Sequence, residues 1–252
     1  MKIIRPNNKK LEKIYNRGFF KSRRVEEKTR RIIEDVRLFG DDALLKYTRK
    51  FDRVKLSLKQ IKVSQIEISG AYQNISPNFI SSLKVIIENV TRFYSKCIKK
   101  SWKKKFEDGL VLGENYSALE KVGIYIPAGT APLASSVYMT VLPAKIAGVK
   151  KIILVTPPDN KGYINPHILV VADLLKVDEI YRVGGAQAIA ALAYGTKTIP
   201  RVDKIIGPGN IYVAEAKRQV FGLVDIDMIA GPTELVIIAN RSSDPKFIVA
   251  DL

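Results

Sequence analysis

The chain has 252 residues, of which 46% are hydrophobic and 27% charged, a composition typical of a globular protein with one large domain or two ordinary ones. No apolar run reaches the roughly 18 residues that span a membrane, and the amino terminus lacks the apolar segment of a secretion signal. The single cysteine, Cys97, excludes an internal disulfide and fits a reducing compartment, so we expect a cytoplasmic protein.

The formal net charge of +17 is concentrated in the amino-terminal half. Residues 1–121 hold 29 Lys and Arg against 14 Asp and Glu, whereas residues 122–252 hold 13 against 11. The densest stretch, residues 96–105, contains Trp102, and such a run can bind phosphates and stack a base. No RNA- or DNA-binding motif accompanies it, so we expect a solvated face. A nucleic-acid-binding domain is the alternative, which heparin retention at physiological salt would favour.

Apolar residues at helical spacing predict two helices within residues 22–50. Gly40 is expected to end the first, and Asp41 or Asp42 to cap the second. A short extended piece at residues 61–63 and a helix over residues 64–72 should follow.

Pro77 is expected in the first turn of a long helix with one apolar face. The basic run at residues 96–105 either continues this helix or ends it. Residues 107–114 then predict a hairpin, with Asp108 and Gly109 in its turn.

From Val122 onward, short apolar strands alternate with helices, a pattern that predicts a doubly wound parallel sheet with right-handed crossovers. After the strand that begins at Val122, expected strands are 151–156, 179–183, 203–206 and 235–239, and expected helices are 135–147, 166–175, 186–194 and 211–220. Asp244 and Pro245 are expected to open a last helix.

Four stretches in this half run from an apolar strand directly into a Gly/Pro-rich turn: residues 122–129, 180–187, 204–210 and 226–234. In parallel α/β sheets the ligand crevice lies beyond the carboxyl ends of the strands. Glycines at that position let backbone N–H groups approach a ligand closely. The sequence therefore predicts a binding crevice at this edge of the sheet.

The polar groups on these turns are Tyr125, Gln187, Asn210 and Thr233. A structural role is open for each: Tyr125 in the core, Gln187 and Asn210 as helix caps, and Thr233 as support of a tight turn. A G-x-G-x-x-G fingerprint is absent, and the only histidine, His167, lacks a partner for metal binding and is expected to be a surface or packing residue. From the residues alone, the crevice has no assigned specificity.

The same stretches resemble the histidinol dehydrogenase family over essentially the whole chain. The specific runs are VGIYIP (122–127), VGGAQAIAALAYG (183–195), VDKIIGPGN (202–210), EAKRQ (215–219) and IDMIAGPTE (226–234). The first half agrees more loosely, through VRLFGDDAL (36–44) and the pair Phe51 and Asp52. Ala128 stands where the family usually has a second glycine after the proline.

The resemblance implies an NAD-dependent zinc enzyme that oxidises L-histidinol to L-histidine through the aldehyde, as an intertwined homodimer. By residue matching, Tyr125, Gln187 and Asn210 fall where the family contacts NAD. Thr233 falls where the family has a substrate-contacting serine, and a hydroxyl is kept. The implied fold has two incomplete Rossmann-like domains, with a helical segment at the amino terminus.

The resemblance also implies domain boundaries. Residues 1–121 would hold the amino-terminal helices and the start of the first Rossmann-like domain, residues 122–233 the second, inserted NAD-binding domain, and residues 234–252 a truncated return to the first. The family's zinc ligands and its Glu-His acid/base pair match no residue here. Since the last helix also stops without a Gly, Pro or polar end, we expect a cut chain that is inactive alone and offers no ligands for zinc. A sister dehydrogenase of another hydroxy compound is the alternative enzyme.

Overall fold

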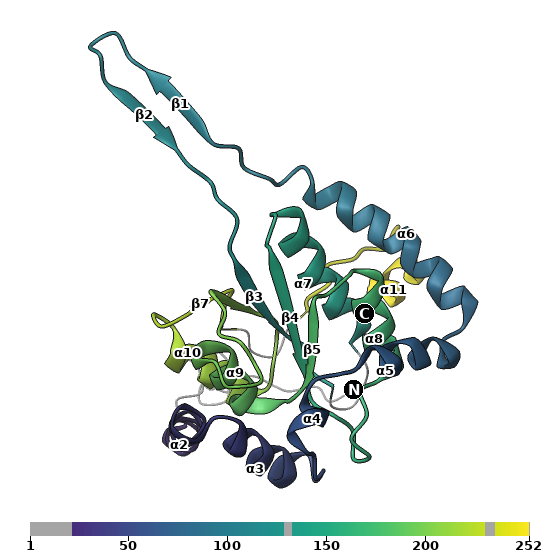
Figure 1. The fold of residues 1–252 in the computed structure, drawn as a ribbon. Helices are drawn as coiled ribbons and strands as arrows, with labels where there is room; N and C mark the ends of the chain where they lie inside the picture. Colours follow the sequence, from purple (N-terminus) through teal and green to yellow (C-terminus); the bar gives the residue numbers. More distant parts are fainter. Residues whose placement is uncertain (1–21, 129–132, 230–234, 252) are drawn as a thin grey trace, which may run out of the picture.

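Five parallel strands form the centre of the fold, in the order β5-β4-β3-β6-β7 (Figure 1). The computed structural model describes residues 22–128, 133–229 and 235–251. The strands are β3 (Lys121–Tyr125), β4 (Lys151–Thr156), β5 (Glu179–Arg182), β6 (Lys204–Ile206) and β7 (Asp225–Ile226). Because the chain builds outward from β3 first on one side and then on the other, the sheet has the order of a Rossmann-like half.

Helices cover both faces of this sheet, which confirms the predicted doubly wound α/β fold (Figure 1). On one face, α7 (Ala134–Ile146) and α8 (Pro166–Leu174) connect β3, β4 and β5, and they share a core with α5 (Gln65–Ala71) and α6 (Pro77–Tyr94). On the other face, α9 (Gly185–Tyr194) and α10 (Ile211–Val220) pack with α2 (Arg23–Phe39) and α3 (Asp41–Phe51). Alternation along β3 serves both cores, since Ile124 faces the first and Tyr125 the second.

The two amino-terminal helices meet at Gly40, as predicted, where the backbone has a φ of 53°. The expected capping by Asp41 or Asp42 is wrong, because no side chain caps α3. Asp41 is instead buried and accepts a hydrogen bond from the Thr198 hydroxyl (2.7 Å), which ties α3 to the loop after α9. This long-range contact outweighs the local capping preference of aspartate.

Two short features connect α3 to the long helix α6. The helix α4 (Leu58–Ile61) was not predicted, and the 3-10 turn η1 (Tyr72–Asn74) follows α5. The predicted extended piece lies next to the sheet, because Lys62 forms an antiparallel bridge with Tyr181 at the β5 edge.

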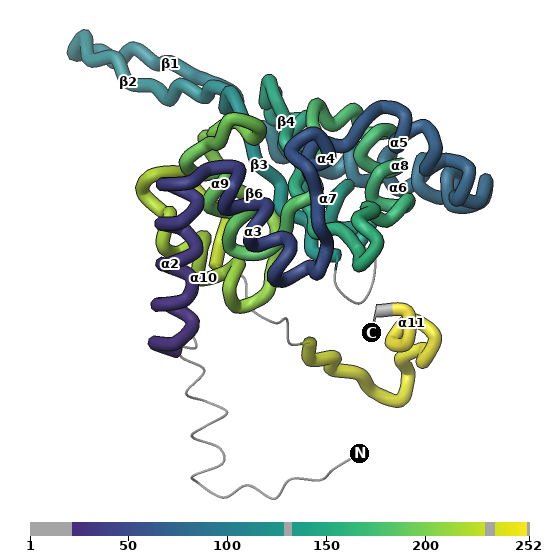
Figure 2. The backbone as a smooth tube through the Cα atoms, turned by 60° about the horizontal axis from the view of Figure 1, so that its bottom comes forward, coloured from purple at the N-terminus to yellow at the C-terminus, as the bar shows by residue number. Residues whose placement is uncertain are grey.

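The hairpin of β1 (Trp102–Lys105) and β2 (Val111–Glu114) projects from the body of the protein (Figures 1 and 2). Its turn contains Asp108 and Gly109, as predicted. The long helix α6 ends at Tyr94, so the basic run does not continue it. Residues 102–105 of the run form β1, which lies outside the predicted hairpin bounds of 107–114. All residues of both strands are exposed.

The predicted strand at residues 235–239 is wrong. This segment has no strand assignment and pairs with no strand in the described ranges, and Val236 and Ile238 are 83% and 95% exposed. An apolar run forms a strand only where a sheet edge accepts its backbone hydrogen bonds. The helix α11 (Pro245–Asp251) begins as predicted, with the Asp244 carboxylate accepting from the Lys246 N–H (2.8 Å). Figure 2 shows residues 235–251 at one side of the body.

The domain boundaries at residues 121/122 and 233/234 stay a prediction. Within the described residues, no helix combines the length and the apolar character needed to cross a membrane.

Candidate functional site

The chain reverses its direction of growth between β3 and β6, and this reversal creates a crevice at the carboxyl edge of the sheet. The connections from β3 through β5 run outward on one face, whereas α9 returns on the other face to place β6 beside β3. At such a switch point the loops after neighbouring strands separate and leave room for a ligand.

A cavity of about 910 Å³ lies at this edge, between the sheet and the helices α2 and α3. It is lined by residues from β3, α9 and α10 as well as from both amino-terminal helices. Three of the predicted site residues, Tyr125, Gln187 and Asn210, are in its lining. Thr233 lies outside the described residues. The volume suits a ligand the size of a dinucleotide.

Tyr125 is both a core residue and a cavity residue. Its side chain is 3% exposed and packs in the core under α9, and its hydroxyl oxygen accepts a hydrogen bond from the Gly185 N–H (3.2 Å). Burial raises the pKa of Tyr125 to about 12, with a smaller contribution from the negative charge of Asp52. The phenol therefore stays neutral and can position a ligand group without charge.

Gln187 is 1% exposed, and its Oε1 atom has no hydrogen-bond partner among the described residues. The capping alternative is not observed, because no side chain caps α9. Gly185 has a φ of 65°, a conformation that lets the chain turn sharply into α9. The Gln187 side chain lies so close to Gly185 that a Cβ there would be 2.7 Å from its Oε1. A buried amide oxygen without a partner is costly. Because this Oε1 has almost no accessible surface, the Gln187 side chain has to turn for a ligand in the cavity to reach it.

Asn210 caps α10 and also lines the cavity. Its Oδ1 accepts from the N–H groups of Tyr212 (3.0 Å) and Val213 (3.1 Å), so the capping role is confirmed. Because capping uses only the oxygen, the amide nitrogen stays available to a ligand in the cavity.

An ion pair between a buried lysine and a partly exposed aspartate holds the turn that carries Asn210. Lys217, which is 1% exposed, pairs with Asp227 and donates to the carbonyl oxygen of Gly207 (3.0 Å). The Asp227 carboxylate in turn accepts from the Gly207 N–H (2.8 Å). Gly207 has a φ of 118° and lies so close to β3 that a Cβ would be 2.1 Å from the Tyr125 carbonyl oxygen. The ion pair therefore sets the position of the turn relative to β3.

Charged residues that the sequence analysis did not assign to the site also line the cavity; we call them its charged wall. Its acidic members are Glu27 and Asp52, and its basic members are Arg24, Lys28, Arg31 and Lys50. The three basic residues of α2 follow each other at helical spacing, which places them on one side of the helix. That spacing was visible in the sequence, but nothing local showed that this side would face the sheet edge.

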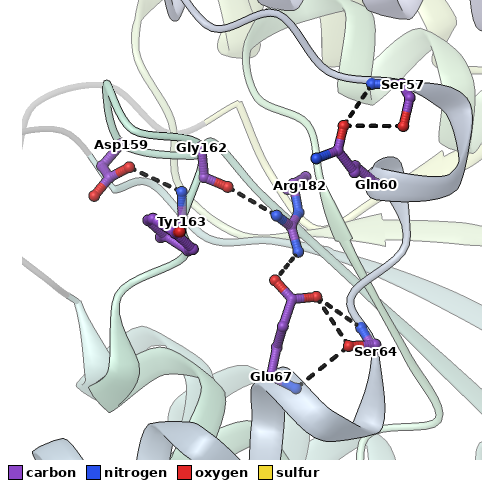
Figure 3. Close-up of polar contacts among 8 residues, drawn as sticks. All are labelled: Ser57, Gln60, Ser64, Glu67, Asp159, Gly162, Tyr163 and Arg182. Atoms are coloured by element: carbon purple, nitrogen blue, oxygen red, sulfur yellow. Dashed lines mark hydrogen bonds and ion pairs between the residues drawn. The ribbon is translucent and has the colours of Figure 1, made fainter.

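A second cavity of about 660 Å³ adjoins the first, and both are lined by Ala128 and Pro157. Arg182, buried at the end of β5, donates to the Gly162 carbonyl oxygen (2.8 Å) and pairs with Glu67 (Figure 3). Glu67 also accepts from the N–H of Ser64 (3.0 Å), the N-cap residue of α5. These contacts tie α5 to the sheet, so we interpret Arg182 as structural.

Metal-ligating side chains do not gather in the described part of the chain: no group of three or more His, Cys, Asp and Glu there has a suitable arrangement. His167 packs its ring edge-on against Phe79 at 4.8 Å between ring centroids, as expected of a packing residue. The side chains in the described ranges therefore do not fit a zinc site.

Strand order and cavity together define a protein of the doubly wound α/β class with a ligand crevice at the topological switch point. Comparison with known proteins specifies it further. The family model for histidinol dehydrogenase matches residues 16–252, and the chain belongs to the histidinol dehydrogenase family.

Individual relatives agree with this assignment. The chain is 54% identical over 221 residues to the histidinol dehydrogenase of Clostridium acetobutylicum, an alignment covering 88% of this chain and 51% of the relative. It is 48% identical over 252 residues to that of Carboxydothermus hydrogenoformans, covering all of this chain and 59% of the relative. The crystal structure of histidinol dehydrogenase from Elizabethkingia anophelis superposes with a TM-score of 0.88 at 38% identity, over 99% of this chain and 57% of that one. The chain thus spans about half the length of the curated relatives it matches.

Proposed function

We propose that the 910 Å³ cavity at the carboxyl edge of the sheet, called the cleft from here on, binds NAD. We also propose that the chain is the dinucleotide-binding part of an enzyme that oxidises L-histidinol to L-histidine. The observation that carries this proposal is that Tyr125, Gln187 and Asn210, from three separate turns, line one cavity of dinucleotide size in a chain of this family. Bound NAD would supply the hydride acceptor for the oxidation.

The role of the protein in this proposal is to hold the dinucleotide. The buried Oε1 of Gln187 would accept a hydrogen bond from it, the amide nitrogen of Asn210 would donate one, and the neutral Tyr125 would form part of the wall. The described residues lack a metal-ligand group, so no catalytic step is assigned to them. We accordingly propose that these 252 residues bind NAD but do not turn over histidinol by themselves.

Replacing Gln187 with methionine, which preserves the side-chain volume, is expected to weaken NAD binding by about 10-fold, the effect of losing one buried hydrogen bond. Isothermal titration calorimetry with NAD measures this. The matched control is Gln219→Ala on α10, where the amide donates to Glu215 (2.7 Å) outside the cavity lining, and its NAD affinity should equal that of the wild type. Equal affinities of Gln187→Met and wild type would contradict the assignment of Gln187.

We also propose that the protein forms a homodimer and that the projecting β1–β2 hairpin takes part in the contact. Both of its strands are exposed, yet it carries Trp102, Leu110 and Leu112. A two-stranded hairpin is marginally stable alone, and exposed apolar groups of this kind are typical of surfaces that another chain covers.

Replacing both Leu110 and Leu112 with serine is therefore expected to shift the protein toward the monomer, because it removes apolar surface from the contact. Size-exclusion chromatography with light scattering measures the mass. Lys104→Ser, in the same hairpin, is the control and should leave the dimer intact. A leucine variant that stays dimeric, or a wild type that is already monomeric, would contradict the proposal.

A further inference from the structure

Asp52 lies at the carboxyl end of α3 and lines the cavity together with Tyr125 and Gln187. Its backbone N–H donates to the Thr48 carbonyl oxygen (2.9 Å) and so ends the helix. The helix end is formed by the backbone N–H, so the carboxylate is not needed for it. Asp52 belongs to the lining of the same cavity as the residues proposed to contact NAD.

This carboxylate is in an unfavourable place in the free protein. Its Oδ2 atom is buried and has no hydrogen-bond partner among the described residues. It also lies at the negative end of the α3 dipole, which disfavours an anion. Burial raises the pKa of Asp52 to about 6, and its charge contributes to the raised pKa of Tyr125. A buried acceptor without a donor costs stability, and such costs occur where a ligand supplies the missing group.

The charged wall of the cavity narrows the class of ligand. Glu27 pairs with Arg23 (3.0 Å), but within the described ranges the basic wall residues Arg24, Lys28, Arg31 and Lys50 form no ion pair with Asp52 or any other residue. Among the described residues, the cavity thus offers cations without an ion-pair partner and two buried acceptors without a donor, Asp52 Oδ2 and Gln187 Oε1. A ligand that carries phosphates for the cations and neutral hydroxyl donors for the carboxylate satisfies both, and a phosphorylated sugar has this combination.

We propose that Asp52 accepts hydrogen bonds from a ribose diol of the bound dinucleotide, with the phosphates on the basic side of α2. An acidic side chain on a ribose hydroxyl is a common solution in NAD-binding folds, although there it follows a strand and here it ends a helix. The proposal rests on NAD as the ligand of the cleft. NAD contains two riboses, and the experiment distinguishes between them.

The test compares wild type, Asp52→Asn and the matched control Asp42→Asn, an exposed acid of the same helix outside the cavity lining. Calorimetry measures the affinity for three ligands: NAD, an analogue without the 2′-hydroxyl on the adenosine ribose, and one without it on the nicotinamide ribose. Thermal unfolding of each variant without ligand gives its melting temperature.

Asp52→Asn is expected to weaken NAD binding by about 10- to 100-fold, since it removes a charge-assisted hydrogen bond. It should weaken one of the two analogues by a clearly smaller factor, which identifies the ribose. The melting temperature should be unchanged or higher, because an unpaired carboxylate at the wrong helix end is removed. Asp42→Asn should bind all three ligands as the wild type does.

Two results would overturn the inference alone: an Asp52→Asn variant that binds NAD as tightly as the wild type, or one that weakens all three ligands by the same factor, whether or not its melting temperature is lowered. Equal weakening together with a lowered melting temperature would make Asp52 a structural residue. If folded wild type binds no NAD at all, the proposed function fails and the inference fails with it.

Discussion

Replacing Gly207 with alanine is expected to lower the free energy of unfolding by about 3 kcal/mol or more and to weaken NAD binding at the same time. Two costs combine, because the residue has a φ of 118° and its new Cβ would lie 2.1 Å from the Tyr125 carbonyl oxygen. Backbone strain of this kind costs about 1–3 kcal/mol, and forced overpacking costs a similar amount. Urea unfolding measures the first effect and calorimetry with NAD the second.

The matched control for this substitution is Gly222→Ala. Gly222 also has a positive φ, of 96°, but no atom lies within 4 Å of a Cβ built there. Its cost should be limited to backbone strain, about 1 kcal/mol, with unchanged NAD affinity. Equal destabilisation by both variants would show that the close approach of the β6–α10 turn to β3 has no energetic importance.

Lys217→Met is expected to destabilise the protein by about 1–3 kcal/mol, because Lys217 is buried with its hydrogen bonds whereas its partner Asp227 is partly exposed. Methionine leaves the Asp227 carboxylate without its cation and the Gly207 carbonyl oxygen without its donor. The turn that carries Asn210 would lose its support, so NAD affinity should fall as well. Urea unfolding and calorimetry again measure the two effects.

Two further variants show whether the cost of Lys217→Met arises from the burial of Lys217 or from the loss of any ion pair. Lys204 and Asp225 form a second Lys–Asp pair (2.7 Å) between β6 and β7, but both side chains are partly exposed. Lys204→Met should therefore cost less than about 1 kcal/mol. Adding Asp227→Asn to Lys217→Met should restore part of the lost stability, because the unpaired charge is removed. A Lys217→Met cost as small as that of Lys204→Met would contradict the proposed support of the turn.

Much of the sheet and of the cleft could be predicted from the sequence, because both depend on local patterns. Short apolar runs followed by glycine turns predicted the strands β3 to β6 and the helices that connect them. The carboxyl ends of parallel strands share one edge, so Tyr125, Gln187 and Asn210 came together without any knowledge of packing. The assignment of NAD to them came from the family resemblance and not from the pattern.

What the sequence did not predict depends on contacts between distant segments. The basic side of α2 and the carboxylate of Asp52 face the cleft only because α2 and α3 pack on α9 and α10. Residues 235–239 have the composition of a strand, but strand formation also requires an edge to pair with. Likewise, nothing in the sequence around Lys217 indicates that this lysine is buried. Its burial depends on the packing that brings it next to Asp227.

A crystal structure of the chain grown with saturating NAD would show whether the cleft at the switch point is the dinucleotide site. We expect electron density for the dinucleotide between α2 and the carboxyl edge of the sheet, in contact with Gln187 and Asn210 and with a ribose at Asp52. Density in the second cavity beside Arg182 instead, or an empty cleft at saturating NAD, would contradict this expectation.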